Sequence, residues 1–189
     1  MAKVRATGAK RKSVEPQSRL PVRREGTPGY RAPEVLLRCN PSAQTGAIDV
    51  WAAGVILCSL LSQTEHFFYA PRGPPGDAFS LECIASVMGR ERLQAVAASL
   101  DRRLSLPKDL PWDGRRRTLR DVIMASQFEV SSRELNVPEE CWDLLERCME
   151  LDPSARITAE EALAHPFFHG FDGHYVDPAA PATTTAASE

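Results

Sequence analysis

Cysteine and histidine are the residues in this chain whose chemistry depends most directly on spacing. The five cysteines are odd in number and none belongs to a C-x-x-C pair, which argues against a disulfide framework and against a zinc knuckle. His165 and His169 have the H-x-x-x-H spacing of zinc fingers, but no closely spaced cysteine pair precedes them. We therefore expect no metal site and no disulfide bonds. We also expect the protein to lie in a reducing compartment.

Asp49 is an informative carboxylate because it lies near the start of the most apolar stretch of the chain. Residues 47–61 follow Thr45, a possible N-cap, and are apolar on nearly every face of a helix. Such a helix belongs in the middle of a domain. A carboxylate in its first turn needs donors, either backbone N–H groups or a cation. The alternative is a simple helix-end charge.

Three further helices are predicted, and strand signals are nearly absent, so the fold should be mainly α. The helices cover about residues 80–88, 138–150 and 158–165. Pro138 is a favoured first-turn residue, and the helix after it places Cys141 and Cys148 on its apolar face as small core residues. Thr158 and Glu161 form a capping box. The alanines that follow them suit a short, closely packed helix.

Length and composition indicate one folded domain. A chain of 189 residues and 20.8 kDa can bury one core, and 43% hydrophobic with 25% charged residues excludes a wholly disordered or fibrous protein. The longest apolar run is too short to span a bilayer. No apolar stretch follows the basic N-terminus as it would in a secretory signal. We expect no membrane association.

The formal net charge of −2 conceals an uneven distribution. Residues 1–24 hold eight Lys or Arg against a single Glu, a net charge of about +7. Within this arm the cluster Lys10, Arg11 and Lys12 either serves nuclear import, touches phosphates or is simply solvated. A second basic stretch, 115–120, lies among aspartates that cancel its field, so we expect a solvated loop there. No direct nucleic-acid binding is expected.

Three separated pieces resemble one family. They are G-T-P-G-Y-R-A-P-E at 26–34, D-V-W-A-A-G at 49–54, and L-D-P-S-A-R-I-T at 151–158 followed by H-P-F-F at 165–168. Their order and spacing resemble the helical C-terminal lobe of a eukaryotic protein kinase, entered near the end of the activation segment. The resemblance implies a partial kinase domain over 26–169. A flexible basic segment, 1–25, would be the remnant of an activation-segment insert, and 170–189 a disordered tail.

Several structural roles follow from this resemblance. In the family the glutamate of A-P-E, here Glu34, pairs with a buried arginine before the last helix, here Arg156. Asp49 corresponds to the aspartate that holds the backbone of the catalytic loop, and Trp51 belongs to the same motif. Thr27 stands where serine/threonine-type kinases place a threonine near the catalytic aspartate. The alternative for each residue is a purely architectural role.

The resemblance also implies a pocket for the substrate residue after the phosphoacceptor, lined by Gly29, Tyr30 and Arg31. Arg24 and Arg31 flank this pocket, and an arginine fork favours an acidic or phosphorylated side chain there through charge-assisted hydrogen bonds. Alternatively, either arginine simply faces solvent. Protein substrates, and acidic ones in particular, are therefore the expected partners.

The parts that transfer a phosphoryl group are not found in this sequence. Kinases need glycines over the phosphates, a strand lysine, a catalytic aspartate and two magnesium ligands, and the chain has no G-x-G-x-x-G, V-A-I-K or H-R-D. Phe171-Asp172-Gly173 has the wrong position to be D-F-G. The intact family uses ATP and magnesium. We assign no catalytic residue and expect neither cofactor to bind this chain alone, which should be inactive without the missing N-terminal lobe.

Among kinases the three pieces are most similar to the cell division cycle seven group, nuclear serine/threonine kinases that trigger replication origins with a regulatory activator subunit. That group has a long insert before the G-T motif, and the loop expected over 89–136, where generic kinases are shorter, is compatible with it. The resemblance implies nuclear localisation. Three interpretations stay open: a portion of an active kinase, a short product that binds substrates or the activator without catalysis, or a lone helical interaction module whose kinase likeness has no functional meaning.

Overall fold

The computed structural model describes residues 26–40, 45–65, 67–68, 76–107, 118–130 and 136–169. The helices are α1 (Pro33–Leu36), α2 (Ala47–Ser62), α3 (Asp77–Met88), α4 (Arg90–Ser99), α5 (Leu119–Val130), α6 (Glu139–Cys148), α7 (Ala159–Leu163) and the 3-10 turn η2 (Pro166–Phe168). These ranges contain no strand, which confirms the mainly α prediction. The predicted basic arm and tail, 1–25 and 170–189, lie outside the described residues.

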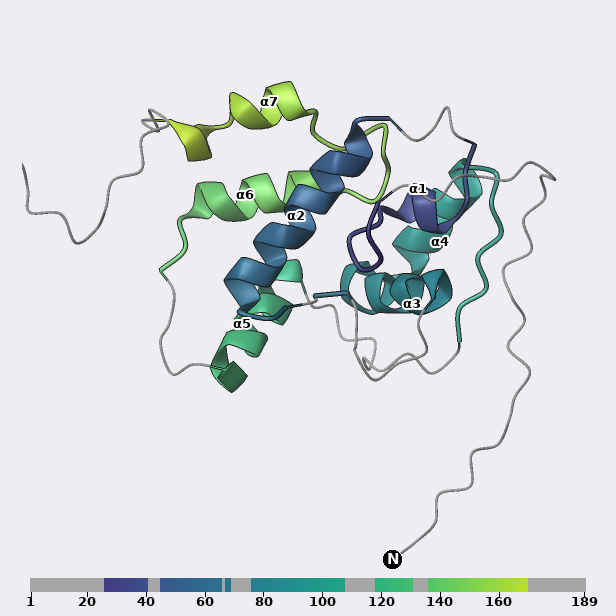
Figure 1. Cartoon of the computed structure of the whole chain (residues 1–189), viewed down its shortest axis with the longest axis horizontal. Coiled ribbons are helices and arrows are strands. Elements are labelled where there is room, and N and C mark those ends of the chain that lie inside the picture. Colours follow the sequence, from purple (N-terminus) through teal and green to yellow (C-terminus); the bar gives the residue numbers. More distant parts are fainter. Residues whose placement is uncertain are drawn as a thin grey trace, which may run out of the picture.

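Helix α2 lies at the centre of the helical arrangement, where it crosses α6 and also packs against α5 (Figure 1). Trp51, Val55 and Cys58 are buried on its inner side. Gly54 lets the two helices approach closely, since a Cβ there would lie 2.7 Å from the Sδ of Met149. The predicted apolar helix 47–61 therefore exists and is built for close packing.

One edge of α2 is open, whereas the apolar pattern of residues 47–61 predicted a helix in the middle of a domain. Ile56 is 51% exposed and Leu60 is 67% exposed, and Asp49 and Ala53 precede them on the same exposed edge. The spacing of four, three and four residues places these side chains along one line of the helix. No element among the described residues covers that line. Only the opposite side of α2 is in the core.

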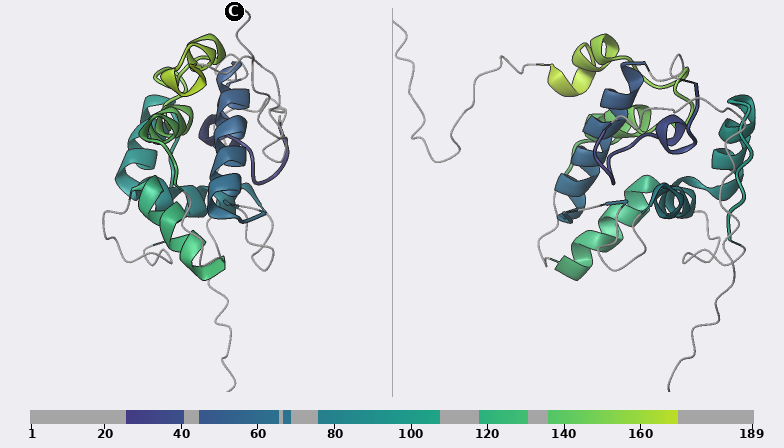
Figure 2. Two further views of the ribbon diagram at one scale, coloured as in Figure 1. Left: turned by 90° about the vertical axis from the view of Figure 1, so that its left-hand side faces the viewer. Right: turned by 45° about the vertical axis from the view of Figure 1, so that its right-hand side comes forward.

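A second group of helices, α1, α3 and α4, lies beside the α2–α5–α6 group (Figure 2). Helix α3 connects the two groups because it packs against α1, α4 and α5. Leu81 and Ile84 of α3 are almost fully buried, as is Leu93 of α4. The core is therefore continuous from the short α1 segment to α6.

The sequence prediction of a long loop over 89–136 is wrong, because α4 and α5 occupy much of it. Leu93 and Ala97 are fully buried one helical turn apart, and Ile123 is fully buried in α5. The solvated-loop prediction is also wrong for Arg120. This residue belongs to α5, pairs with Glu139 at 2.9 Å, and stands 5.1 Å from the ring centroid of a tryptophan on α6.

The helices predicted at the C-terminal end are confirmed, with small differences. Pro138 is the N-cap of α6 rather than its first residue. Thr158 and Glu161 form both hydrogen bonds of the predicted capping box on α7. However, α7 buries none of its residues and Leu163 is 75% exposed, so its packing is looser than its alanines suggested. None of the described helices is long and apolar enough to cross a membrane.

Candidate functional site

The most deeply buried charges of the described chain are Glu34 and Arg156. Arg156 donates from Nη1 to Glu34 Oε1 at 2.8 Å and from Nη2 to Oε2 at 3.1 Å. Both side chains have an exposed fraction of 0%. The structure therefore brings these two residues, which the resemblance paired, into a two-pronged contact between α1 and the turn before α7.

Arg156 also holds the beginning of α2 and the end of α6. Its Nη1 donates to the carbonyl oxygen of Ala47 at 2.8 Å, and its Nε to that of Glu150 at 2.8 Å. The guanidinium carbon stands 5.1 Å from the ring centroid of Trp51, which is fully buried and stacks on Phe68. One side chain thus joins three helical elements around the tryptophan of the D-V-W motif.

The segment 26–31 forms a tight turn above this core. Gly26 and Gly29 have φ of 79° and 89°, a conformation that glycine adopts without strain, and Tyr30 N donates to Thr27 O at 3.1 Å. Thr27 is exposed and Gly29 is buried. The hydroxyl of Tyr30 donates to the carbonyl of Glu65 at 3.4 Å. The threonine is therefore presented to solvent, while Tyr30 joins the turn to the loop after α2.

Arg31 lies at the edge of this turn and is engaged in an ion pair. Its Nε donates to Gly26 O at 2.9 Å, and its Nη1 donates to Asp77 Oδ1 at 3.1 Å. Arg38 Nη2 lies 4.0 Å from Asp77 Oδ2. Asp77, in the first turn of α3, was missed by the sequence analysis because nothing in its local pattern marks it. The second proposed arginine, Arg24, lies outside the described residues.

Asp49 lies apart from these contacts. It is exposed in the first turn of α2, and no hydrogen bond or ion pair of its carboxylate occurs within the described part of the chain. Its position matches the helix-end charge that the sequence left open, and the backbone that the resemblance assigns to it is not part of this sequence. The role of Asp49 stays a prediction.

The cysteines and histidines do not form a reactive or metal-binding cluster in the described ranges. Burial raises the pKa of the Cys58 thiol and raises that of Cys83 to about 11, so both stay protonated at neutral pH. Among the described residues, these two thiols are therefore poor nucleophiles in the folded protein.

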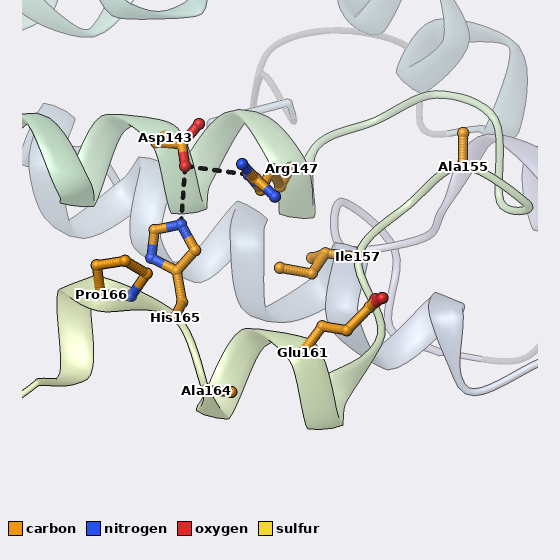
Figure 3. A pocket seen from close by; sticks show the side chains of 8 residues that line it. All are labelled: Asp143, Arg147, Ala155, Ile157, Glu161, Ala164, His165 and Pro166. Atoms are coloured by element: carbon orange, nitrogen blue, oxygen red, sulfur yellow. Dashed lines mark hydrogen bonds and ion pairs between the residues drawn. The ribbon is translucent and has the colours of Figure 1, made fainter.

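His165 closes a hollow of about 420 Å³ between α6 and α7 (Figure 3). Its Nε2 lies 2.8 Å from Asp143 Oδ2, and its Nδ1 accepts from Phe167 N at 3.2 Å. That acceptor role places the ring proton on Nε2 when the ring is neutral. The bond from His165 lowers the pKa of Asp143. The ring thus joins α6 to η2 and caps the 3-10 turn, a structural role.

Comparison with known proteins places this geometry in context. The protein kinase domain family matches residues 8–168. The probable serine/threonine-protein kinase cdc7 of Dictyostelium discoideum is 41% identical over 150 residues, which make up 78% of this chain and 13% of that protein. The cell division cycle 7-related protein kinase of Homo sapiens is 33% identical over an alignment of 204 positions, gaps included. This alignment covers 77% of this chain and 34% of that protein.

A shorter relative, the probable cell division control protein 7 homolog 2 of Encephalitozoon cuniculi, is 35% identical over 180 residues, covering 92% of this chain and 46% of the relative. The chain therefore spans less than half the length of these three relatives. The match to the family model, over residues 8–168, includes both partners of the buried ion pair.

Proposed function

Because the chain belongs to the protein kinase family and is Cdc7-like, we propose that it forms the substrate-recognising C-terminal lobe of an enzyme that phosphorylates serine and threonine in proteins. The observation that carries this proposal is the buried pair of Glu34 and Arg156, which fixes the turn 26–31 relative to α2 and α6. A kinase lobe must hold its substrate segment rigidly, since phosphoryl transfer depends on positioning.

The chemistry itself belongs to parts that this sequence does not contain. ATP and magnesium would bind a nucleotide lobe with its own lysine and acidic ligands. We propose that the 189-residue chain alone neither binds ATP nor transfers phosphate. Its functional contribution is to present Thr27 and the turn around Gly29 beside a catalytic loop packed on α2.

The substrate class we propose is acidic protein segments, and the cellular process is replication initiation. Arg31, beside the turn, supplies a cation for a carboxylate or phosphate one residue after the phosphoacceptor. The relatives carry cell division cycle names, which supports a role in cell-cycle control. The basic cluster at Lys10, Arg11 and Lys12 supports a nuclear location.

A chimera tests the proposal. Residues 26–169 would replace the matching segment of the Homo sapiens relative, and transfer of labelled phosphate to a Ser-Asp peptide would be measured with ATP, magnesium and that relative's activator subunit. We expect transfer by the chimera, none by the 189-residue chain, and strong loss in a chimera with Glu34→Ala. A folded chimera that binds ATP and transfers no phosphate would contradict the proposal.

One observation favours a second, non-catalytic function. The open edge of α2 exposes Ile56 and Leu60, and exposed apolar surface of this kind serves as a contact for other proteins. The alternative is a short product that competes for the activator subunit or the substrate. Adding the chain to the active relative tests it: inhibition that disappears with Leu60→Asp supports competition, whereas unchanged phosphorylation excludes it.

A further inference from the structure

The ion pair between Arg31 and Asp77 places a carboxylate next to the arginine that would bind an acidic side chain of the substrate. The Nη1–Oδ1 distance is 3.1 Å, and each of the two side chains has an exposed fraction of 14%. A second cation, Arg38, approaches the other carboxylate oxygen at 4.0 Å and is 36% exposed. Two cations thus share one resident carboxylate at the border between the turn 26–31 and α3.

We propose that Asp77 is a specificity-determining residue that masks Arg31 and Arg38, so that an acidic or phosphorylated side chain has to compete with it for these two guanidinium groups. This inference rests on the proposed function. Asp77 carries no chemistry itself. It sets how much negative charge a ligand needs before it binds.

The charges of the three side chains support masking. With Asp77 ionised, the cluster carries a net charge of +1; without that carboxylate it would carry +2. All three side chains lie within 4.0 Å of a partner, well inside the Debye length of roughly 8 Å at physiological ionic strength, so solvent ions screen the attraction among these three groups less than they screen the attraction to an approaching peptide. A dianionic phosphate competes with a carboxylate more effectively than a second monoanion does.

Arg31 keeps capacity for a ligand while it is masked. An arginine has five N–H donors, and within the described chain Arg31 uses one at Gly26 and one at Asp77. Its Nε contact to Gly26 does not involve Asp77, so the side chain stays directed along the turn when the carboxylate is neutralised. Removal of the charge should therefore expose a positioned cation.

The test measures binding of peptides to the 189-residue chain. Three fluorescent peptides differ only after a serine, where they carry Asp, phosphoserine or Ala, and fluorescence polarisation is recorded at low and at physiological salt. Asp77→Asn removes the charge and keeps an acceptor oxygen. Glu91→Gln is the matched control, since it removes an exposed carboxylate from the first turn of the neighbouring α4.

We expect Asp77→Asn to strengthen binding of the Asp peptide by about threefold or more at low salt, with a smaller gain at physiological salt. The Ala peptide and Glu91→Gln should show no change, and Asp77→Ser should give the same direction as Asp77→Asn in case one variant folds poorly. The preference for phosphoserine over Asp should fall in both Asp77 variants.

The outcomes separate this inference from the proposed function. If the unmodified chain prefers the acidic peptides and Arg31→Ala abolishes that preference, the proposed substrate class stands; unchanged or weaker binding by Asp77→Asn would then overturn the masking role alone. If neither the unmodified chain nor the Asp77 variants distinguish Asp from Ala, or if none binds any peptide, both ideas are overturned.

Discussion

Removing one partner of the buried ion pair should greatly lower the free energy of unfolding of this chain. Arg156→Met takes the guanidinium from a site in which both side chains are fully buried. A charge left alone in such a site typically costs about 3–5 kcal/mol. That loss is a large fraction of the roughly 5–15 kcal/mol by which domains are stable, so the effect is large enough to measure.

The contacts predict that replacing the glutamate and replacing the arginine cost different amounts of stability. Arg156 also donates to the carbonyls of Ala47 and Glu150, whereas the carboxylate of Glu34 is bonded, among the described residues, to Arg156 alone. Glu34→Gln therefore leaves a guanidinium with neutral acceptors, a loss of about 2–3 kcal/mol. Arg156→Met leaves a carboxylate with no donor and should fall near the upper end of the range, about 4–5 kcal/mol.

Urea unfolding followed by circular dichroism measures these losses, and a double-mutant cycle with Glu34→Leu and Arg156→Met measures the coupling. We expect the double variant to lose much less than the sum of the single variants, because neither charge is then stranded. Arg92→Met, which breaks the exposed pair with Glu150, should change little. Additivity within about 0.5 kcal/mol, or a loss below about 1 kcal/mol for Arg156→Met, would refute the reasoning.

Three further changes have distinct expected results. Gly54→Ala should lower the free energy of unfolding by about 1–3 kcal/mol, because its Cβ would meet a methionine sulfur at 2.7 Å; Gly46→Ala, which has nothing within 4 Å, is its control, and equal losses would contradict this. Thr158→Ala should cost about 1 kcal/mol, with faster amide hydrogen exchange confined to α7; unchanged exchange there would exclude the capping role. The bond from His165 lowers the pKa of Asp143 below its ordinary value of 3.8, so its contribution to stability is complete above that value and is lost as the pH falls through the folded pKa. Asp143→Asn should therefore weaken the acid dependence of thermal melting, and superimposable curves would disprove it.

The sequence predicted elements whose signals are local. The apolar run 47–61 and the capping box at Thr158 depend on neighbouring residues, and both predictions agree with the structure. Helices α4 and α5 also have local signals, such as Leu93 with Ala97. These apolar patterns are short and lie between charged residues, and the prediction gave more weight to the basic residues around Arg120. The prediction of a loop there failed for that reason.

Contacts between distant parts of the chain could not be derived from the residue pattern. Glu34 and Arg156 were paired only by resemblance to a family, since nothing near either residue identifies the other. Asp77 had no such guide, and its contact with Arg31 joins positions 46 residues apart. The residue pattern also could not identify Ile56 and Leu60 as the exposed side chains of α2, because an apolar residue does not reveal whether another element covers it.

The contact of Glu34 with Arg156 joins positions 122 residues apart, and this separation has a consequence for synthesis. At about 5–20 residues per second, a ribosome makes the arginine roughly 6–24 s after the glutamate. Throughout that interval the carboxylate has to remain hydrated, so α1 cannot take its final, buried place while the nascent chain is still short. The last docking step of this lobe is therefore set by translation, and an arrested chain ending before position 156 should be an open intermediate suited to capture by chaperones.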